Sequence, residues 1–155
     1  MARILGYIAS SLDGFIAADD DKLDWLFQYN DMDLGEHDYK SFLTRVRTLV
    51  MGRGTYDFLA NDPAPWGYDD HRVLVVTSRP IDRPKGKLEV RSDIDALIAE
   101  LRALDEIEIY LIPELLGGGR PLFPATGHRV SPKLVSAQAL DRGCVRLHYR
   151  FDRSE

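Results

Sequence analysis

The chain has 155 residues, 45% of them hydrophobic and 29% charged, which suits one globular domain spanning residues 1–155. The net charge of -5 argues against general binding to nucleic acids or anionic membranes, which needs clustered positive charge. A single cysteine excludes an internal disulfide and favours the cytoplasm. No apolar run approaches the roughly 20 residues that cross a bilayer, and residues 1–9 are too short and polar for a signal peptide.

The N-terminal half alternates predicted strands and helices, which is typical of an α/β fold. Its first strand is ended by the turn pair Asp13-Gly14. Apolar residues at i, i+3, i+4 and i+7 indicate an amphipathic helix from Tyr39 to Val46. The expected elements are a strand over 4–10, a short helix near 23, a helix over 39–46, a strand over 48–51, a helix over 55–60 and a strand over 73–77.

The C-terminal half is predicted to contain one helix followed by three strands. Ser92 to Asp95 has the spacing of a capping box and predicts a helix over 94–101. From Glu106 the apolar residues alternate with a period of two, which predicts a strand over 106–112. Two further strands, 133–140 and 145–151, are expected to pair antiparallel around 141–143. In the second of them the pattern predicts a core face and an outward face, the latter made of Arg146, His148 and Arg150.

A first candidate for chemistry is Met51-Gly52-Arg53-Gly54-Thr55-Tyr56, which joins a predicted strand to a predicted helix. Two glycines free the backbone, and the open N–H groups at a helix N-terminus attract anions. Arg53 adds a planar cation suited to phosphate, and Thr55 adds a hydroxyl. The same residues would equally make a tight strand-to-helix turn with a surface arginine, and the motif alone does not separate the two.

A second candidate follows the strand over 73–77, at Thr77-Ser78-Arg79-Pro80. In an open α/β sheet, ligands bind outside the carboxyl ends of the strands, and these side chains could hold a second phosphate. The alternative is a capped strand end without a ligand. The two motifs together, each following a strand and each with an arginine, are more informative than either alone.

These motifs belong to a wider resemblance. The chain resembles the dihydrofolate reductase-like family, which includes the reductase domain of bacterial riboflavin biosynthesis enzymes and small stand-alone reductases. The resemblance covers nearly the whole chain in the family's order, through residues 7–17, 24–26, 51–56, 76–79, 113–123 and 145–149. It implies a three-layer α/β sandwich with a mixed, mostly parallel sheet and an antiparallel C-terminal hairpin.

The resemblance implies an NADPH-dependent reductase that transfers a hydride to a C=N or C=O carbon of a small heterocyclic or carbonyl substrate. Reduction of 5-amino-6-(5-phosphoribosylamino)uracil or of dihydrofolate is the model reaction. It places Ala9 and Ile16 along the nicotinamide, and it places at the phosphates Gly52, Arg53, Gly54, Thr55, Thr77, Ser78 and Arg79. Two arginines at a ribose phosphate favour NADPH over NADH.

Reduction of the substrate also requires a proton. Asp24 is the first candidate proton donor and Asp13 the second, although Asp13 is also well explained as a turn residue. Trp25 is expected to form part of the substrate wall, with core packing as the alternative. The histidines show no metal-ligand spacing, so no metal is expected. A homodimer is expected, with no nucleic-acid or membrane partner.

One feature departs from the family. A strand-helix unit of roughly twenty residues, whose glycines approach the cofactor pyrophosphate in the family, has no counterpart before Glu106. Gly117-Gly118-Gly119 matches a later glycine run and is predicted to be a bulge or irregular turn. Either the protein is trimmed or the sequence omits a segment. Loss of a central strand would expose pairing edges, which dimerisation or a rearranged sheet could cover. A non-catalytic dimeric ligand-binding protein of the same fold is therefore the alternative function.

Overall fold

The computed structural model describes residues 3–82, 84–93, 105–123, 125, 127 and 129–151, which form mixed α/β structure. The chain divides into two compact units, the first with residues 1–35 and 103–155 and the second with residues 36–102. The helix predicted over 94–101 lies outside the described residues. The single domain over 1–155 stays a prediction. Within the described residues, no helix is long and apolar enough to span a membrane.

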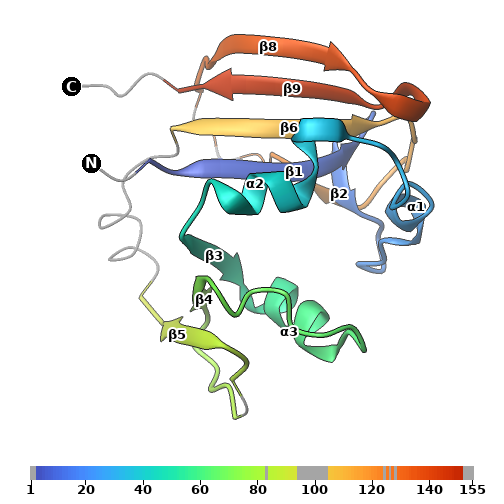
Figure 1. Ribbon diagram of the computed structural model, residues 1–155. Helices are drawn as coiled ribbons and strands as arrows, with labels where there is room; N and C mark the ends of the chain where they lie inside the picture. The colour runs from blue at the N-terminus through green and yellow to red at the C-terminus, as the bar shows by residue number, and fades with distance from the viewer. Residues whose placement is uncertain are drawn as a thin grey trace. The chain divides into compact units, whose positions relative to one another are not determined.

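The first unit is built on a four-stranded sheet with the order β1-β6-β9-β8 (Figure 1). β1 (Leu5–Ser11) runs parallel to β6 (Glu106–Ile112), and β6 is antiparallel to β9 (Val145–Arg150). β9 pairs antiparallel with β8 (Lys133–Ala139) through the 3-10 helix η2 (Asp141–Gly143). The predicted strands and the antiparallel hairpin are confirmed, with boundaries within one residue.

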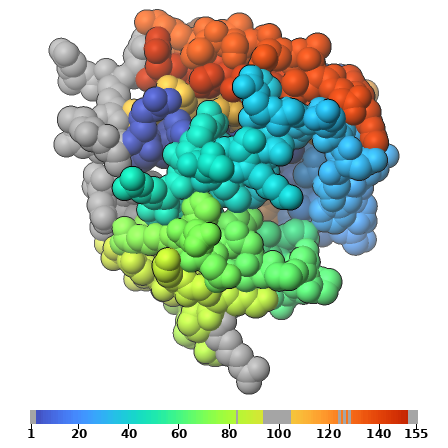
Figure 2. All heavy atoms as spheres, viewed as in Figure 1, coloured from blue at the N-terminus to red at the C-terminus, as the bar shows by residue number. Residues whose placement is uncertain are grey.

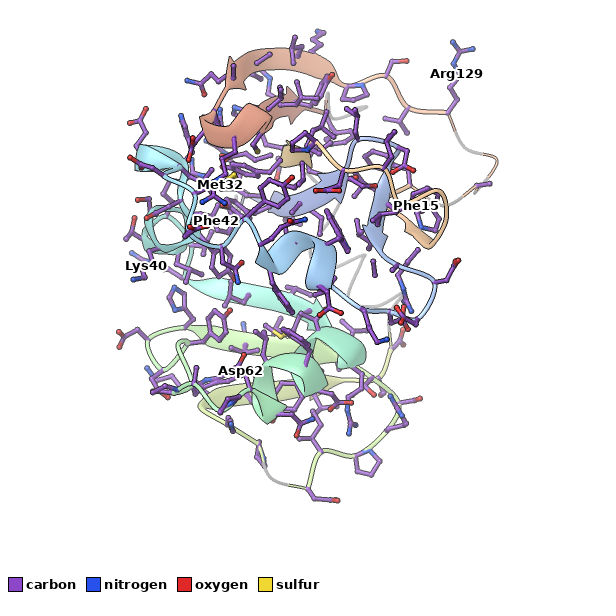
Figure 3. The ribbon with its side chains drawn as sticks, turned by 90° about the vertical axis from the view of Figure 1, so that its right-hand side faces the viewer. Phe15, Met32, Lys40, Phe42, Asp62 and Arg129 are labelled. Atoms are coloured by element: carbon purple, nitrogen blue, oxygen red, sulfur yellow. The ribbon has the colours of Figure 1, made fainter. Side chains whose placement is uncertain are left out.

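Short elements complete the first unit. β2 (Phe15–Ala17) pairs antiparallel with β7 (Arg120–Pro121), where Phe15 lies opposite Pro121. Phe15 is labelled in Figure 3. α1 (Asp24–Phe27) confirms the short helix expected near residue 23. η1 (Gly35–His37) follows where the chain leaves the unit. The buried core combines Tyr110, Ile112 and Cys144 with partly buried residues that include Trp25, Leu26, Tyr29 and Met32.

The glycine run after β6 is an irregular turn, as predicted. Gly117 and Gly119 both have positive φ, at 70° and 132°. A Cβ on Gly119 would lie 2.1 Å from the backbone oxygen of Ala17. Only glycine therefore lets this turn approach β2 so closely.

The second unit holds a three-stranded parallel sheet in the order β3-β4-β5. Its strands are β3 (Thr48–Gly52), β4 (Arg72–Val76) and β5 (Lys87–Arg91), and its helices are α2 (Tyr39–Thr44) and α3 (Arg53–Asn61). The buried core joins Tyr56 of α3 to Val73 and Val75 of β4. α3 begins two residues earlier than expected, and α2 ends before Val46. Figure 3 shows Phe42 on α2, and Asp62 where α3 ends.

One predicted orientation in the first unit is wrong. Arg146 was expected to face outward, but only 5% of it is exposed. Its Nε donates to the Glu108 carboxylate at 3.1 Å, and its Nη1 donates to Ser136 and Gln138 at 3.2 and 3.0 Å. β9 is an inner strand between β6 and β8, so its polar residues reach partners across the sheet. A buried arginine is tolerated because a carboxylate neutralises it and other groups use its donors.

The described strands form separate main sheets in the two units. Within the described residues, β1 pairs with β6 alone and β3 pairs with β4 alone, so each sheet ends in a strand with an open edge. At the other end of the first sheet, β8 lies at the outer edge of its unit (Figure 2), where Leu134 and Val135 are exposed. Open edges of this kind are the consequence expected when a central strand is absent.

Candidate cofactor and substrate residues

In the second unit, the N-terminus of α3 directly follows β3. Gly52 is the N-cap residue, no side chain caps the helix, and the first turn contains no acidic residue. The first N–H groups of a helix have no partner inside the helix, and the helix dipole makes this end positive. The turn predicted from the sequence is therefore present, with the features that attract an anion.

Gly52 and Gly54 are not explained by local geometry. Neither has a positive φ, so neither position requires glycine for its backbone conformation. Apart from the adjoining residues and the backbone of α3 itself, no atom of the described residues lies within 4 Å of the place where a Cβ would sit on either glycine. The space above this helix end is therefore open, which is what close approach of a phosphate to the backbone requires.

Arg53 ties the two predicted motifs together. Its Nε donates to the Asp57 carboxylate at 2.7 Å, and its Nη1 donates to the Pro80 carbonyl at 2.9 Å. The segment after β4 therefore lies beside the N-terminus of α3, as the shared edge of parallel strands predicts. The contacts also show that part of the Arg53 guanidinium is already used within the protein.

The side chains after β4 divide into one buried and two exposed groups. Thr77 is 8% exposed, and its hydroxyl accepts from the backbone N–H of Arg79 at 3.1 Å. Ser78 and Arg79 are exposed. Within the part of the chain that the structure describes, the Arg79 guanidinium makes no hydrogen bond or ion pair. Thr77 therefore shapes the turn, while Ser78 and Arg79 are available to a ligand.

Arg91 is a further candidate that the sequence reasoning missed. It ends β5 opposite Val76, and its carbonyl accepts from Thr77 N–H at 2.9 Å. Its Nε is buried without a hydrogen-bond partner among the described residues. Its Nη2 lies 3.5 Å from the Glu89 carboxylate, which Arg72 also binds at 2.6 and 2.7 Å. The alternation of Leu88 and Val90 was the available signal for β5.

In the first unit, the predicted nicotinamide residues lie on β1 and β2. Ala9 is half-buried, pairs with Tyr110 across the sheet and packs against the core. Ile16 is half-buried in β2. The structure thus places both residues in strands of the same unit.

Asp24 and Trp25 lie together on α1. Asp24 is exposed in the first turn of the helix. Trp25 packs against the cluster of Tyr110, Ile112 and Cys144, so the core-packing alternative describes its ring. Its indole N–H, however, is buried without a hydrogen-bond partner among the described residues. A buried donor without an acceptor is costly, and this one is a candidate contact for a bound molecule.

Asp13 is engaged inside the protein. Its carboxylate accepts from the Ser11 hydroxyl at 2.6 Å and from the N–H groups of Leu116 and Gly117 at 3.2 and 2.7 Å. These bonds, led by the one from Ser11, lower the pKa of Asp13. A carboxylate held in its ionised form is a poor proton donor near neutral pH. The geometry therefore favours the turn interpretation of Asp13 over the catalytic one.

Comparison with known structures places the chain in a family. A protein of Shewanella sp. PV-4, provisionally assigned to riboflavin biosynthesis, is 30% identical and superposes with a TM-score of 0.81 over 99% of this chain and 100% of its own. Dihydrofolate reductase from Enterococcus faecalis, solved with NADP(H), shares the fold at 20% identity, with a TM-score of 0.63 over 97% of both chains. This chain belongs to the dihydrofolate reductase-like family. The predicted family and fold are confirmed, and the fold is that of a reductase.

Two sequence relatives contain segments that this chain lacks. Two uncharacterized Bacillus subtilis proteins, YwjB and YyaP, are 28% and 23% identical, with 92% and 97% of this chain and 94% and 95% of theirs covered. Both alignments, at 167 and 184 residues, are longer than this chain of 155 residues. Each relative therefore contains residues without a counterpart here. No protein-family model matches the chain.

Proposed function

We propose that the protein is a cytoplasmic NADPH-dependent reductase acting on a C=N or C=O group of a small heterocyclic or carbonyl substrate. The observation that carries the proposal is the open N-terminus of α3. There Gly52 and Gly54 leave free space, and the exposed Ser78 and Arg79 follow the neighbouring strand. Uncapped N–H groups and a guanidinium without a partner among the described residues are the groups that hold phosphates.

The residues of the second unit fit the phosphates of this cofactor. The N–H groups and hydroxyl of the first turn of α3, including Thr55, would hold the pyrophosphate. Arg79 would pair with the 2′-phosphate, with Ser78 and Arg91 beside it. Arg53 would contribute mainly by fixing the turn, because two of its nitrogens already bind Asp57 and Pro80.

The residues of the first unit are assigned to the reacting end. Bound NADPH supplies a hydride, and family membership assigns Ala9 and Ile16 to the nicotinamide. We assign delivery of the balancing proton to Asp24 rather than to Asp13, since Asp13 is committed to three hydrogen bonds. Trp25 would orient the substrate through its indole N–H, which has no hydrogen-bond partner among the described residues.

The decisive experiment is a titration with NADPH and NADH followed by tryptophan fluorescence. We expect saturable NADPH binding, and R79A should weaken it by about tenfold to a hundredfold, the value of a charge-assisted hydrogen bond. NADH binding should change little. K87A is the matched control, because it also removes a cation from the second unit but at the amino end of β5. Equal losses for both nucleotides would contradict the 2′-phosphate role.

The substrate is tested separately. NADPH oxidation should be measured with dihydrofolate and with 5-amino-6-(5-phosphoribosylamino)uracil, the substrates of the model reactions. D24N should lower kcat with an accepted substrate, and NADPH affinity should stay unchanged. If D24N keeps the full kcat, Asp24 is not the proton donor.

A non-catalytic dimeric ligand-binding protein is the second candidate. Among the described residues β1 pairs with β6 alone and β3 with β4 alone, and the curated relatives contain residues without a counterpart here. Both observations favour this candidate, because they agree with loss of one strand-helix unit. Absence of saturable NADPH binding below about 1 mM would select this candidate over the reductase. Light scattering coupled to gel filtration tests the proposed homodimer, for which the exposed β8 edge offers a pairing surface.

A further inference from the structure

The segment that carries Asp24 and Trp25 is attached to the rest of the first unit by side chains that the proposed chemistry does not use. After α1 the chain continues through tight turns, in which the N–H groups of Tyr29 and Met32 donate to Leu26 and Tyr29 at 2.9 and 3.0 Å. Such a short helix has little stability of its own. Its position therefore depends on contacts with other elements.

Glu114 makes the first of these contacts. Its Oε1 accepts from the Gln28 side-chain amide at 2.9 Å and from the Tyr29 hydroxyl at 2.7 Å. The bond to the carboxylate raises the pKa of Tyr29, so this hydroxyl stays a donor at neutral pH. Glu114 follows β6, and its carbonyl accepts from Leu12 N–H at 2.8 Å.

Arg142 makes the second contact, from the β8–β9 turn. Its Nη1 donates to the Gln28 carbonyl at 2.9 Å, and its Nη2 pairs with Asp31 at 2.6 Å. Arg142 has a φ of 51°, a left-handed conformation that non-glycine residues rarely adopt. A glycine would suit the backbone better, so the side chain is the reason for the arginine here.

Asp13 stabilises the turn that follows Glu114. Its carboxylate binds the N–H groups of Leu116 and Gly117, which fixes the turn directly after Glu114. Asp13, predicted as the second candidate proton donor, thus helps to hold Glu114 in place, and Glu114 in turn binds the segment after α1.

We propose that Glu114 and Arg142 are positioning residues that clamp residues 24–32 onto the first unit and thereby orient Asp24 and Trp25 for the substrate. The orientation of Asp24 and Trp25 for the substrate rests on the proposed reductase activity. The attachment of residues 24–32 by Glu114 and Arg142 does not, so the attachment and the activity can be tested separately.

Hydrogen exchange of the full chain tests the clamp. In E114A and R142G, the amides of residues 24–32 should exchange about tenfold faster or more, because local opening becomes easier. R142G keeps the turn, since glycine accepts a φ of 51°. E114Q should retain slow exchange, because its amide oxygen still accepts from Tyr29. R3A is the matched control, as it breaks an arginine–carboxylate pair with Glu106 in the same unit.

Two further readouts separate positioning from general loss of structure. Peptides of the second unit should keep their exchange rates, and NADPH affinity should change less than about twofold. With a substrate that the parent reduces, kcat should fall in E114A and R142G and recover in E114Q. Exchange of residues 24–32 equal to that of R3A would overturn the proposal. A parent protein that binds no NADPH would overturn the reductase and leave the exchange result standing.

Discussion

The two compact units use their predicted functional residues in opposite ways. In the second unit, space is open at the Cβ positions of Gly52 and Gly54, and the Arg79 guanidinium makes no hydrogen bond or ion pair within the described residues. In the first unit, the Asp13 carboxylate accepts three hydrogen bonds, and Gly119 packs against Ala17. A glycine turn or an acidic residue therefore indicates a ligand only where the protein itself makes no use of it.

The largest expected effect concerns the buried ion pair of the first unit. R146A should lower the free energy of unfolding by about 3–5 kcal/mol, because it leaves the buried Glu108 charge without its partner. D57A, which breaks the more exposed pair with Arg53 in the second unit, should cost less than about 1 kcal/mol. Urea unfolding followed by circular dichroism measures both. Similar losses would remove this contrast between the units.

The next test uses one glycine from each unit. G119A should destabilise the protein by about 2 kcal/mol or more, because its Cβ collides with backbone at a strained φ. G54A should stabilise by about 0.5–1 kcal/mol, as alanine favours a helix, and yet weaken NADPH binding. Thermal unfolding and the nucleotide titration measure the two properties. A G54A variant with unchanged NADPH affinity would show that this motif is a strand-to-helix turn without a role in binding NADPH.

Cys144 reports on the core of the first unit. It is fully buried, and burial raises the pKa of its thiol, so the folded protein keeps the thiol protonated at pH 8. Reaction with a disulfide reagent should be about a hundredfold slower in the native protein than in urea. Equal rates would show that this core opens readily.

The smallest expected effect is the pH dependence contributed by Asp13. Its pKa in the folded protein lies below the ordinary value of 3.8, so the unfolded state binds the proton more readily. The stabilisation from Asp13 is therefore present above about pH 4 and is lost as pH falls through the folded pKa. D13N should flatten the acid limb of stability against pH. An unchanged acid limb would show that its hydrogen bonds add nothing measurable.

Much of the fold could be predicted because its strands and helices carry strong local patterns. The period of two gave β6, and the β-branched run gave β4. β2 and β7 are too short to show a pattern, with three and two residues. β5 was missed because its alternation is short, with only two apolar residues, Leu88 and Val90, among five. Arg146 was placed wrongly because alternation predicts a side, and only neighbouring strands decide whether that side is covered.

The sequence by itself determined the family, the order of most elements and the two arginine motifs after β3 and β4. Those features depend on residue type and spacing, which local backbone preferences translate directly into structure. Tertiary structure alone decided which donors remain available. Arg53 binds protein groups while Arg79 makes no ion pair within the described residues, and Asp13 fixes a turn. Such outcomes depend on contacts between residues far apart in the chain, for example Gly117 and Asp13, which no local pattern contains.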